Sequence, residues 1–521
     1  MAEVSDHQLL YQDALLELHE NIDSEPRAVF DFLYPVDTLD EYNSGVALNL
    51  LGILHDSSDI LSEKRGLTKC INLGKTLKSR DLAPEEKARL EYILGNCRAS
   101  LFRINGNITN WDWESSEREE IIRRFRKALD SKGAEKLSVE ELQKSYTNLG
   151  NALSNTGRWI EAFDYWRNAI EIDESFLRAK GQIGMSLRSY ALHLPEPSEQ
   201  LVLLQTAHDY LRDTLESGNL HPQMRDTFQK NYHWIHSNVS PYLLDMDIDL
   251  NQHSLGSGSE QKYRQWCLKN RLFLNPINDV TTDNKAAKDT LHLPTTNSKN
   301  ELMKCAGFFN QMKQEYVSAR YRFWKGITRR SGHYSDKGVI RMNTDDFPMH
   351  SVSVEEIKSG LKTSYSIFDK IASLLDFYFD LGNIPSYQLH FDKVWYKSRS
   401  KNNLASEFKN KKNWPLRGLF WLSKDLEFES ELTVTESLEP GAEELRKLRN
   451  NIEHGHVRVL SNFSKEAEYS NSDCELSHDV FCSELVDSTA KIIHKARAAL
   501  IYLSLGIYQE EGENVGMASQ S

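Results

Sequence analysis

The stretch from Glu443 to His456 holds side chains whose types suit cleavage of a phosphodiester. Arg449, Asn450 and His454 supply a permanent cation, an amide and the side chain that most readily exchanges a proton near neutral pH. Cleaving RNA without a metal ion needs one group to move protons and another to neutralise the charge that builds on the phosphate. We therefore interpret Arg449, Asn450 and His454 as candidate catalytic residues, and we expect neither a metal ion nor a cofactor.

A helix is expected to position these side chains. Good helix formers precede Arg449, apolar residues recur at three- and four-residue steps, and Gly455 marks the end. Five helical positions separate Arg449 from His454 by about 140° of arc. One straight helix would not bring the two side chains face to face, so either the helix end distorts or two chains contribute. Asn450 stands four residues before His454 and is expected on the same face.

This pattern resembles the signature of the HEPN superfamily (higher eukaryotes and prokaryotes nucleotide-binding). The signature is an arginine, then a polar residue, with four residues between the arginine and a histidine near the end of a bundle helix. Arg449 to His454 fits it, including the polar Asn450. The resemblance covers residues 260–508 and implies a metal-independent RNA endonuclease that acts on single-stranded or structured RNA. It also implies a homodimer in which the two motifs meet.

Residues 1–253 predict helical repeats. The positions that resemble the tetratricopeptide consensus are Tyr146, Leu149-Gly150, Leu153, Gly157-Arg158-Trp159, Ala162, Trp166 and Ala169. Leu94-Gly95 and Ile183-Gly184 repeat the first half, and the second helix after Gly95 is expected at residues 121–128. One helix pair cannot bury its own apolar face, so several must stack. The surface they form would bind a protein segment, such as a trigger or inhibitor, or a nucleic acid. The alternative is a plain helical bundle.

The expected fold class is all-α. Residues 1–253 form the tetratricopeptide-like domain, 254–299 a connecting segment, 300–508 a HEPN-like helical bundle and 509–521 a disordered tail. A run of small residues at 254–259 marks the boundary. Residues 263–276 are too aromatic for a free linker and are expected to pack against a domain. A HEPN bundle joined to such repeats resembles proteins of prokaryotic conflict systems, which implies a role in antiphage defence or in a toxin–antitoxin system.

Residues 393–417 form a basic segment in an otherwise acidic chain. Its candidate RNA-binding residues are Lys397, Arg399, Lys401, Lys409, Lys411, Lys412 and Arg417. Aromatic residues alternate with them at Trp395, Tyr396, Phe408 and Trp414. Lysines that meet phosphates and rings that stack on bases would suit single-stranded RNA. The alternative is a solvated basic loop whose aromatic residues anchor it to the core.

Composition limits the remaining classes of function. The formal net charge of −13 argues against a protein that coats duplex DNA with its whole surface. The six cysteines form no CxxC pair, and the chain contains neither a signal peptide nor an apolar run of about 18 residues. We expect a cytoplasmic protein without membrane contact. A second hypothesis is a non-catalytic scaffold with a degenerate HEPN bundle that binds nucleotide or protein. A metal site at Glu453, His454 and His456 is the weakest alternative.

Overall fold

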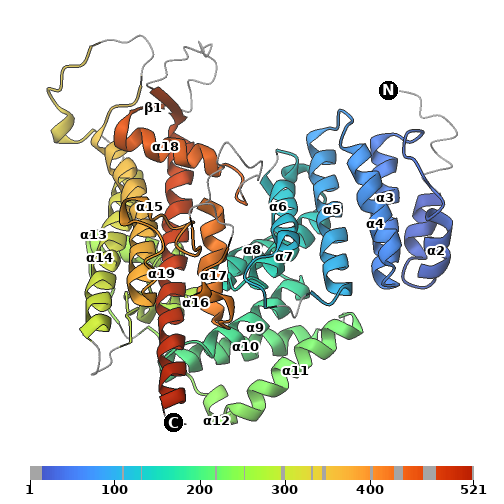
Figure 1. Ribbon diagram of the computed structural model, residues 1–521, viewed down its shortest axis with the longest axis horizontal. Coiled ribbons are helices and arrows are strands. Elements are labelled where there is room, and N and C mark those ends of the chain that lie inside the picture. Colours follow the sequence, from blue (N-terminus) through green and yellow to red (C-terminus); the bar gives the residue numbers. More distant parts are fainter. Residues whose placement is uncertain are drawn as a thin grey trace. The chain divides into compact units, whose positions relative to one another are not determined.

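The chain is largely helical, which confirms the all-α prediction (Figure 1). The structure is a computed structural model, and it describes residues 14–107, 111–130, 132–217, 220–251, 253–294, 300–329, 332–342, 348–398, 403–426, 438–461 and 477–518. No helix within these ranges combines the length and the apolar character that a membrane crossing requires.

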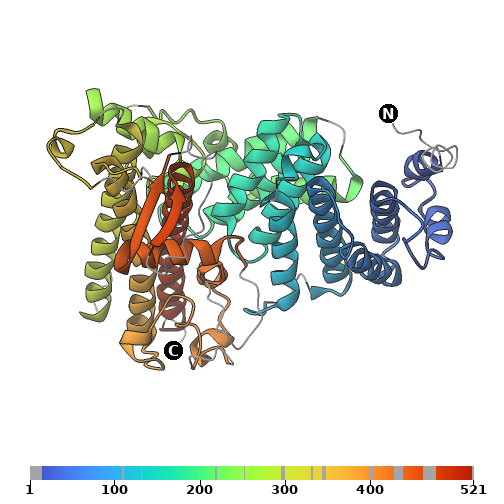
Figure 2. The same cartoon turned by 90° about the horizontal axis from the view of Figure 1, so that it is seen from above.

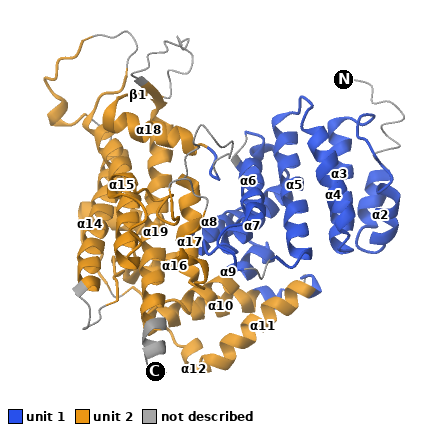
Figure 3. Cartoon of the chain, viewed as in Figure 1, with its two compact units in different colours: residues 1–183, 214–222, 438–440 blue, residues 184–213, 223–437, 441–521 orange. Residues whose placement is uncertain are grey.

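The chain divides into two compact units (Figure 3). Unit 1 takes residues 1–183, 214–222 and 438–440, and unit 2 takes 184–213, 223–437 and 441–521. The boundary expected at residue 253 therefore lies inside unit 2.

Unit 1 is a series of helices, and each of the first seven packs against its neighbours in the series. They are α2 (Pro26–Leu33), α3 (Ser44–Ile60), α4 (Lys64–Leu77), α5 (Pro84–Ile104), α6 (Ser116–Asp130), α7 (Val139–Ser154), α8 (Trp159–Ile172) and the start of α9 (Leu177–Ala191). Alternate helices also touch, α3 with α5 and α5 with α7. Contacts to both the next helix and the next but one are what stacked helical hairpins make. The predicted repeat-like packing is confirmed.

Glycine makes the closest of these helix contacts achievable. A Cβ on Gly150 of α7 would lie 2.5 Å from the indole nitrogen of Trp166 on α8. A Cβ on Gly95 of α5 would lie 2.8 Å from the ring of Phe125 on α6. Both distances are below van der Waals contact, so only glycine lets the aromatic ring seat against the helix backbone. The displaced second helix expected at residues 121–128 is confirmed by α6.

Unit 2 is built on three long helices, α14 (Asn300–Thr328), α15 (Val352–Phe379) and α19 (Cys482–Ala518). They pack on one another and lie side by side in both views (Figures 1 and 2). Shorter helices complete the unit: α10 (Pro197–Glu216), α11 (Pro222–Asn238), α12 (Pro241–Leu244), α13 (Gly258–Lys269), α16 (Ser406–Lys409), α17 (Trp414–Ser423) and α18 (Ala442–His454). The strands β1 (His456–Leu460) and β2 (Ser477–Phe481) pair in parallel, with His456 opposite Ser477.

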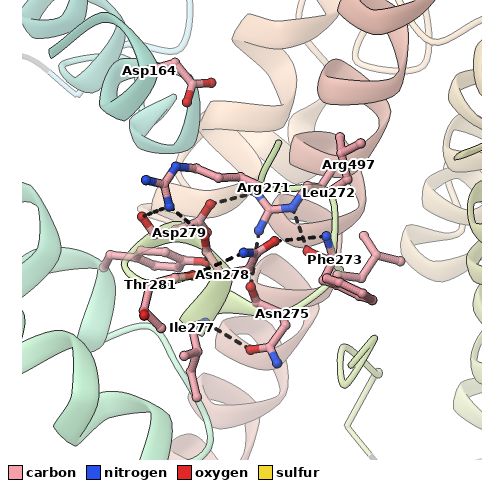
Figure 4. A network of polar contacts seen from close by, with 12 residues as sticks. Asp164, Arg271, Leu272, Phe273, Asn275, Ile277, Asn278, Asp279, Thr281 and Arg497 are labelled. Carbon is pink, nitrogen blue, oxygen red and sulfur yellow. Dashed lines mark hydrogen bonds and ion pairs between the residues drawn. The ribbon is translucent and has the colours of Figure 1, made fainter. Parts of the chain in front are cut away.

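The segment between α13 and α14 belongs to the core of unit 2. Arg497 of α19 reaches into it and donates to the carboxylate of Asp279 at 2.7 Å, to Phe273 O at 2.7 Å and to Asn275 O at 3.2 Å (Figure 4). Tyr190 of α9 donates to the other oxygen of Asp279 at 3.2 Å. The side chains of Arg497 and Asp279 are 3% and 2% exposed. The expectation that this aromatic stretch packs against a domain is confirmed.

The expected disordered tail is wrong for Gln509–Ala518, which continue α19. This end of the helix carries two glutamates, Glu510 and Glu511. In the folded chain both carboxylates have partners: Glu510 accepts from Asn413 and pairs with Lys411, and Glu511 accepts from Tyr378 at 2.7 Å. These tertiary contacts stabilise a helix end that local sequence would leave frayed. Residues 519–521 lie outside the described residues.

Candidate active site

The helix α18 carries the arginine and histidine of the sequence pattern. It spans Ala442–His454, with Glu443 and Glu444 in its first turn, where carboxylates complement the helix dipole. Leu445 and Leu448 lie on its buried side, and the helix packs on α15. The N–H of Gly455 bonds to Asn451 O and ends the helix. The predicted helix and its end at Gly455 are confirmed.

Arg449 is held from three directions. Its guanidinium donates to Asn450 Oδ1 at 3.0 Å and pairs with Glu453 Oε2 at 2.9 Å. It also lies over the ring of Tyr365 on α15, 5.5 Å from the ring centre. The side chain remains 25% exposed. A cation fixed in this way has a defined position from which it can meet an anion that approaches from solvent.

His454 reaches the same carboxylate oxygen as Arg449. Its Nε2 lies 3.7 Å from Glu453 Oε2, while 78% of its side chain is exposed. The expected divergence of Arg449 and His454 is therefore smaller than their angle on the helix implies. Glu453 stands one turn from Arg449 and next to His454, so both long side chains bend toward it.

The amide of Asn450, expected on the same helix face as His454, accepts a hydrogen bond from the adjacent Arg449. The amide of Asn450 and the guanidinium of Arg449 both line the same cavity. Asn450 therefore supports the arginine of the pattern rather than the histidine.

A cavity of about 220 Å³ opens beside Arg449 and Asn450. The rest of its polar lining consists of Arg446 of α18, Tyr365 and Asp369 of α15, and His390 and Asp392 of the loop after α15. His454 is not among the lining residues. Burial raises the pKa of Tyr365, so its phenol stays protonated near neutral pH. Two arginines in a small cavity are suited to an oxyanion such as a phosphate group.

Residues 296–510 match the LA2681-like HEPN family. This part of the chain is a HEPN domain. The matched residues nearly coincide with the HEPN-like bundle expected at 300–508. They include α18 with Arg449 and His454. No curated protein matches the chain.

Sequence reasoning missed most of the cavity lining in the HEPN domain, including Tyr365, Asp369, His390 and Asp392. They come from α15 and the loop after it, far from α18 in sequence. The sequence contained one signal for Asp369. This carboxylate directly follows Phe368 and so lies beside the apolar stripe of α15. No signal in the spacing linked His390 to Arg449.

The basic segment of the HEPN domain does not present the aromatic residues expected to stack on RNA bases. Trp395, Tyr396 and Phe408 are buried, and Trp414 is half-buried. Buried rings cannot stack on a base, so the alternative interpretation is the correct one for these three. They form a cluster in which Trp395 lies 5.1 Å from Phe408 and 5.6 Å from Phe420 between ring centres.

The cations of the segment divide into separate groups. Lys397, Lys409 and Lys412 are exposed, Lys411 pairs with Glu510, and Arg417 is only 1% exposed. Arg417 is therefore not an RNA contact, since it lies inside the fold over the ring of Trp414. Arg399 and Lys401 lie outside the described residues. Three exposed lysines remain as candidates for contact with phosphate.

The metal alternative finds no support among the described residues, which contain no group of three His, Cys, Asp or Glu side chains arranged as ligands. Glu453 turns toward Arg449, while His456 begins β1 beyond Gly455.

Unit 1 contains a larger polar cavity of about 440 Å³. The helices α3, α5 and α7 contribute most of its lining, and α6 and α9 supply the rest. Asn148, Asn151 and Asn155 recur along α7 in this lining, and Asn148 donates to Asn96 of α5 at 2.8 Å. A side-chain amide can donate and accept at once, which is what a backbone peptide group requires of a partner.

Proposed function

We propose that this protein is a metal-independent RNA endonuclease of the HEPN type. The approach of Arg449 and His454 to one carboxylate oxygen, beside a cavity lined by two arginines, carries the proposal. The arginines can bind the phosphate as permanent cations. The imidazole of His454 is open to solvent and can therefore exchange a proton with the 2′-hydroxyl or the 5′-oxygen of RNA. HEPN domains commonly bind RNA and dimerise, which supports RNA as the substrate.

In the proposed reaction, the 2′-hydroxyl of RNA attacks the adjacent phosphorus, and the bond to the 5′-oxygen breaks. His454 exchanges a proton with one of these two oxygens, and Arg449 neutralises the charge on the phosphorane. Asn450 keeps the Arg449 guanidinium in place through its 3.0 Å hydrogen bond. Proton transfer contributes about 10²–10⁴-fold to the rate, and positioned positive charge adds a comparable factor.

The test is cleavage of total RNA by the purified protein in EDTA, with mapping of the cut ends. We expect 2′,3′-cyclic phosphate or 3′-phosphate ends and 5′-hydroxyls. Arg449→Ala and His454→Ala should each reduce cleavage at least 100-fold, because each removes a group that acts in the transition state.

The matched control is Lys447→Ala, which removes a cation on the exposed side of the same helix, where the lysine is 52% exposed. This variant should cleave as wild type does. The proposal fails if either site variant cleaves normally at unchanged melting temperature. It also fails if EDTA abolishes activity and magnesium or manganese restores it.

A second candidate function is a non-catalytic scaffold. The observation that favours it is that Glu453, Asn450 and Tyr365 already occupy the Arg449 guanidinium. In that case Arg449 would stabilise the bundle rather than meet a phosphate. Expression in a bacterial host separates the two functions, since a ribonuclease should be toxic in a way that depends on His454 and a scaffold should not.

The cavity of unit 1 supports regulation as part of the proposed function. Lys144 and Arg178 add positive charge beside its asparagines, and Asp56 and Asp59 add negative charge. A cavity that combines both signs of charge with side-chain amides suits an extended protein segment as its ligand. A nucleic acid backbone, which carries only negative charge, suits it less. We assign it to a protein trigger or inhibitor in antiphage defence or a toxin–antitoxin system, a setting that rests on the resemblance to conflict-system proteins.

A further inference from the structure

The cavity beside Arg449 contains its own imidazole. His390 lines the cavity together with Arg446, Arg449 and Asn450, whereas His454 stands outside it. The side chain of His390 is 44% exposed, so a ligand can reach it. Within one chain, His390 is therefore the histidine that shares a space with the cations.

Asp369 orients this histidine. Its Oδ1 lies 3.5 Å from Nδ1 of His390, and Asp369 itself is on the rigid helix α15. In the role proposed below, the proton stands on Nδ1 beside this carboxylate, and Nε2 is the atom that accepts a proton. Among the described residues, Nε2 of His390 has no recorded protein partner. The other charged groups of the cavity are Asp392 and the two arginines.

The loop that carries His390 is anchored rather than loose. Phe391, the next residue, is 3% exposed and packs on Phe368 of α15, with 5.3 Å between ring centres. Trp395 donates to Phe391 O at 2.9 Å and is fully buried. The aromatic residues that the sequence suggested for base stacking instead fix the backbone on which His390 stands. Such support is what a proton-transferring group needs to keep a productive geometry.

We propose that His390 is a further catalytic residue of this site, acting as the general base, with Asp369 as its positioning residue. This inference rests on the proposed ribonuclease function. Nε2 of His390 accepts the proton of the 2′-hydroxyl, and the 2′-oxygen forms a bond to phosphorus. The bond from phosphorus to the 5′-oxygen breaks, and His454 donates a proton to that oxygen. The products are a 2′,3′-cyclic phosphate and a 5′-hydroxyl, with one proton moved from His454 to the leaving group and one taken up by His390.

The test is single-turnover cleavage of a short RNA by the full chain, in EDTA, from pH 5 to pH 9. His390→Ala should lower the maximal rate at least 100-fold and remove the fall in rate at low pH, because a base loses activity when protonated. Binding of the same RNA with a 2′-O-methyl group at the cut site should change less than threefold. Added imidazole should restore part of the rate. The control is His221→Ala, an exposed histidine of unit 1, which should change nothing.

A modified leaving group separates the two histidines. RNA with sulfur in place of the 5′-bridging oxygen has a leaving group that needs no proton. It should restore cleavage by His454→Ala but not by His390→Ala. Asp369→Asn should lower the rate about tenfold alone and cause no further loss in the His390→Ala background, as for residues that act through one another. His390→Gln repeats the test with a side chain of similar size if the alanine variant unfolds.

Three results would overturn the inference. Normal rate and pH profile in His390→Ala, at unchanged melting temperature, would remove His390 from the reaction while the proposed function stands. Equal losses of binding and rate, with the low-pH fall retained, would show that His390 only holds RNA. Absence of cleavage by the wild-type protein would contradict both the inference and the proposed function.

Discussion

Glu453 determines how the two residues of the HEPN pattern meet. It accepts Arg449 at 2.9 Å and His454 at 3.7 Å, and Lys362 of α15 stands 3.8 Å from its other oxygen. A phosphate that enters the cavity must compete with this carboxylate for the Arg449 guanidinium. Since Glu453 is 15% exposed and Arg449 is 25% exposed, an RNA phosphate can approach the arginine without unfolding the helix end.

A different histidine, His193, makes the stability of the fold depend on pH. Burial lowers the pKa of His193 to about 4, because the interior disfavours the charged imidazolium. Between that value and the ordinary pKa of about 6.5 the unfolded chain binds a proton that the folded chain does not. Its contribution is present above pH 6.5 and is lost as the pH falls. The expected loss from this residue between pH 7 and pH 5 is about 2 kcal/mol.

Urea unfolding of wild type and His193→Gln at the two pH values measures this contribution. The variant should lose about 2 kcal/mol less than wild type on acidification. Other histidines titrate equally in both proteins and cancel in the difference. Equal pH dependence in the two proteins would contradict the assignment.

At the scale of elements, α19 joins the parts of unit 2 that lie far apart in sequence. Arg497 binds the segment after α13, Glu510 binds Asn413 before α17, and Glu511 binds Tyr378 of α15. α15 in turn packs on α18 and carries Tyr365 and Asp369 of the cavity. The position of the candidate site therefore depends on the contacts that α19 makes with its neighbours.

Asp279→Ala tests this role of α19. The substitution leaves the guanidinium of Arg497, which is 3% exposed, without its carboxylate in the interior. Breaking a buried ion pair on one side typically costs about 3–5 kcal/mol. We expect a loss of that size in urea unfolding. The control is Asp226→Ala, which breaks an exposed pair with Lys230 and should change stability by less than about 0.5 kcal/mol. A similar small loss for Asp279→Ala would show that the buried pair does not hold the segment in place.

At the scale of the whole molecule, we expect the active form to be a homodimer joined through the HEPN domains. His454 ends α18, is 78% exposed and lies outside the cavity that contains Arg449. A histidine in this position is accessible to a second copy of the chain. Two-fold symmetry would then allow the His454 of one protomer to serve the Arg449 of its partner.

Mixing Arg449→Ala chains with His454→Ala chains tests the shared site. If each site takes one residue from each protomer, random pairing restores about a quarter of wild-type activity, because half of the dimers then hold one intact site. The readout is RNA cleavage by the refolded or co-expressed mixture, with each single variant alone as the background. No recovery, together with an active monomer in sedimentation, would contradict the dimer.

The sequence by itself determined what depends on local pattern. Apolar positions at helical steps predicted α18, because a helix must bury one stripe wherever it packs. Gly150 and Trp166 predicted their helix pair, because a glycine on one helix leaves room for an aromatic ring of the next. The spacing of Arg449, Asn450 and His454 indicated the HEPN domain, since those residues stand on one helix and their separation is fixed by the chain.

Only the tertiary structure decided what depends on distant contacts. It placed His390 and Asp369 beside Arg449, although they precede it by more than fifty residues. It buried Trp395 and Phe408, which the sequence of the basic segment had suggested as stacking partners for RNA bases. Removing an aromatic ring from water into the core lowers the free energy of the folded chain. The tertiary structure continued α19 to Ala518, since Asn413, Lys411 and Tyr378 supply partners for two glutamates that look solvated in sequence. Periodicity shows which face of a helix is buried, but only the folded chain shows what is buried against it.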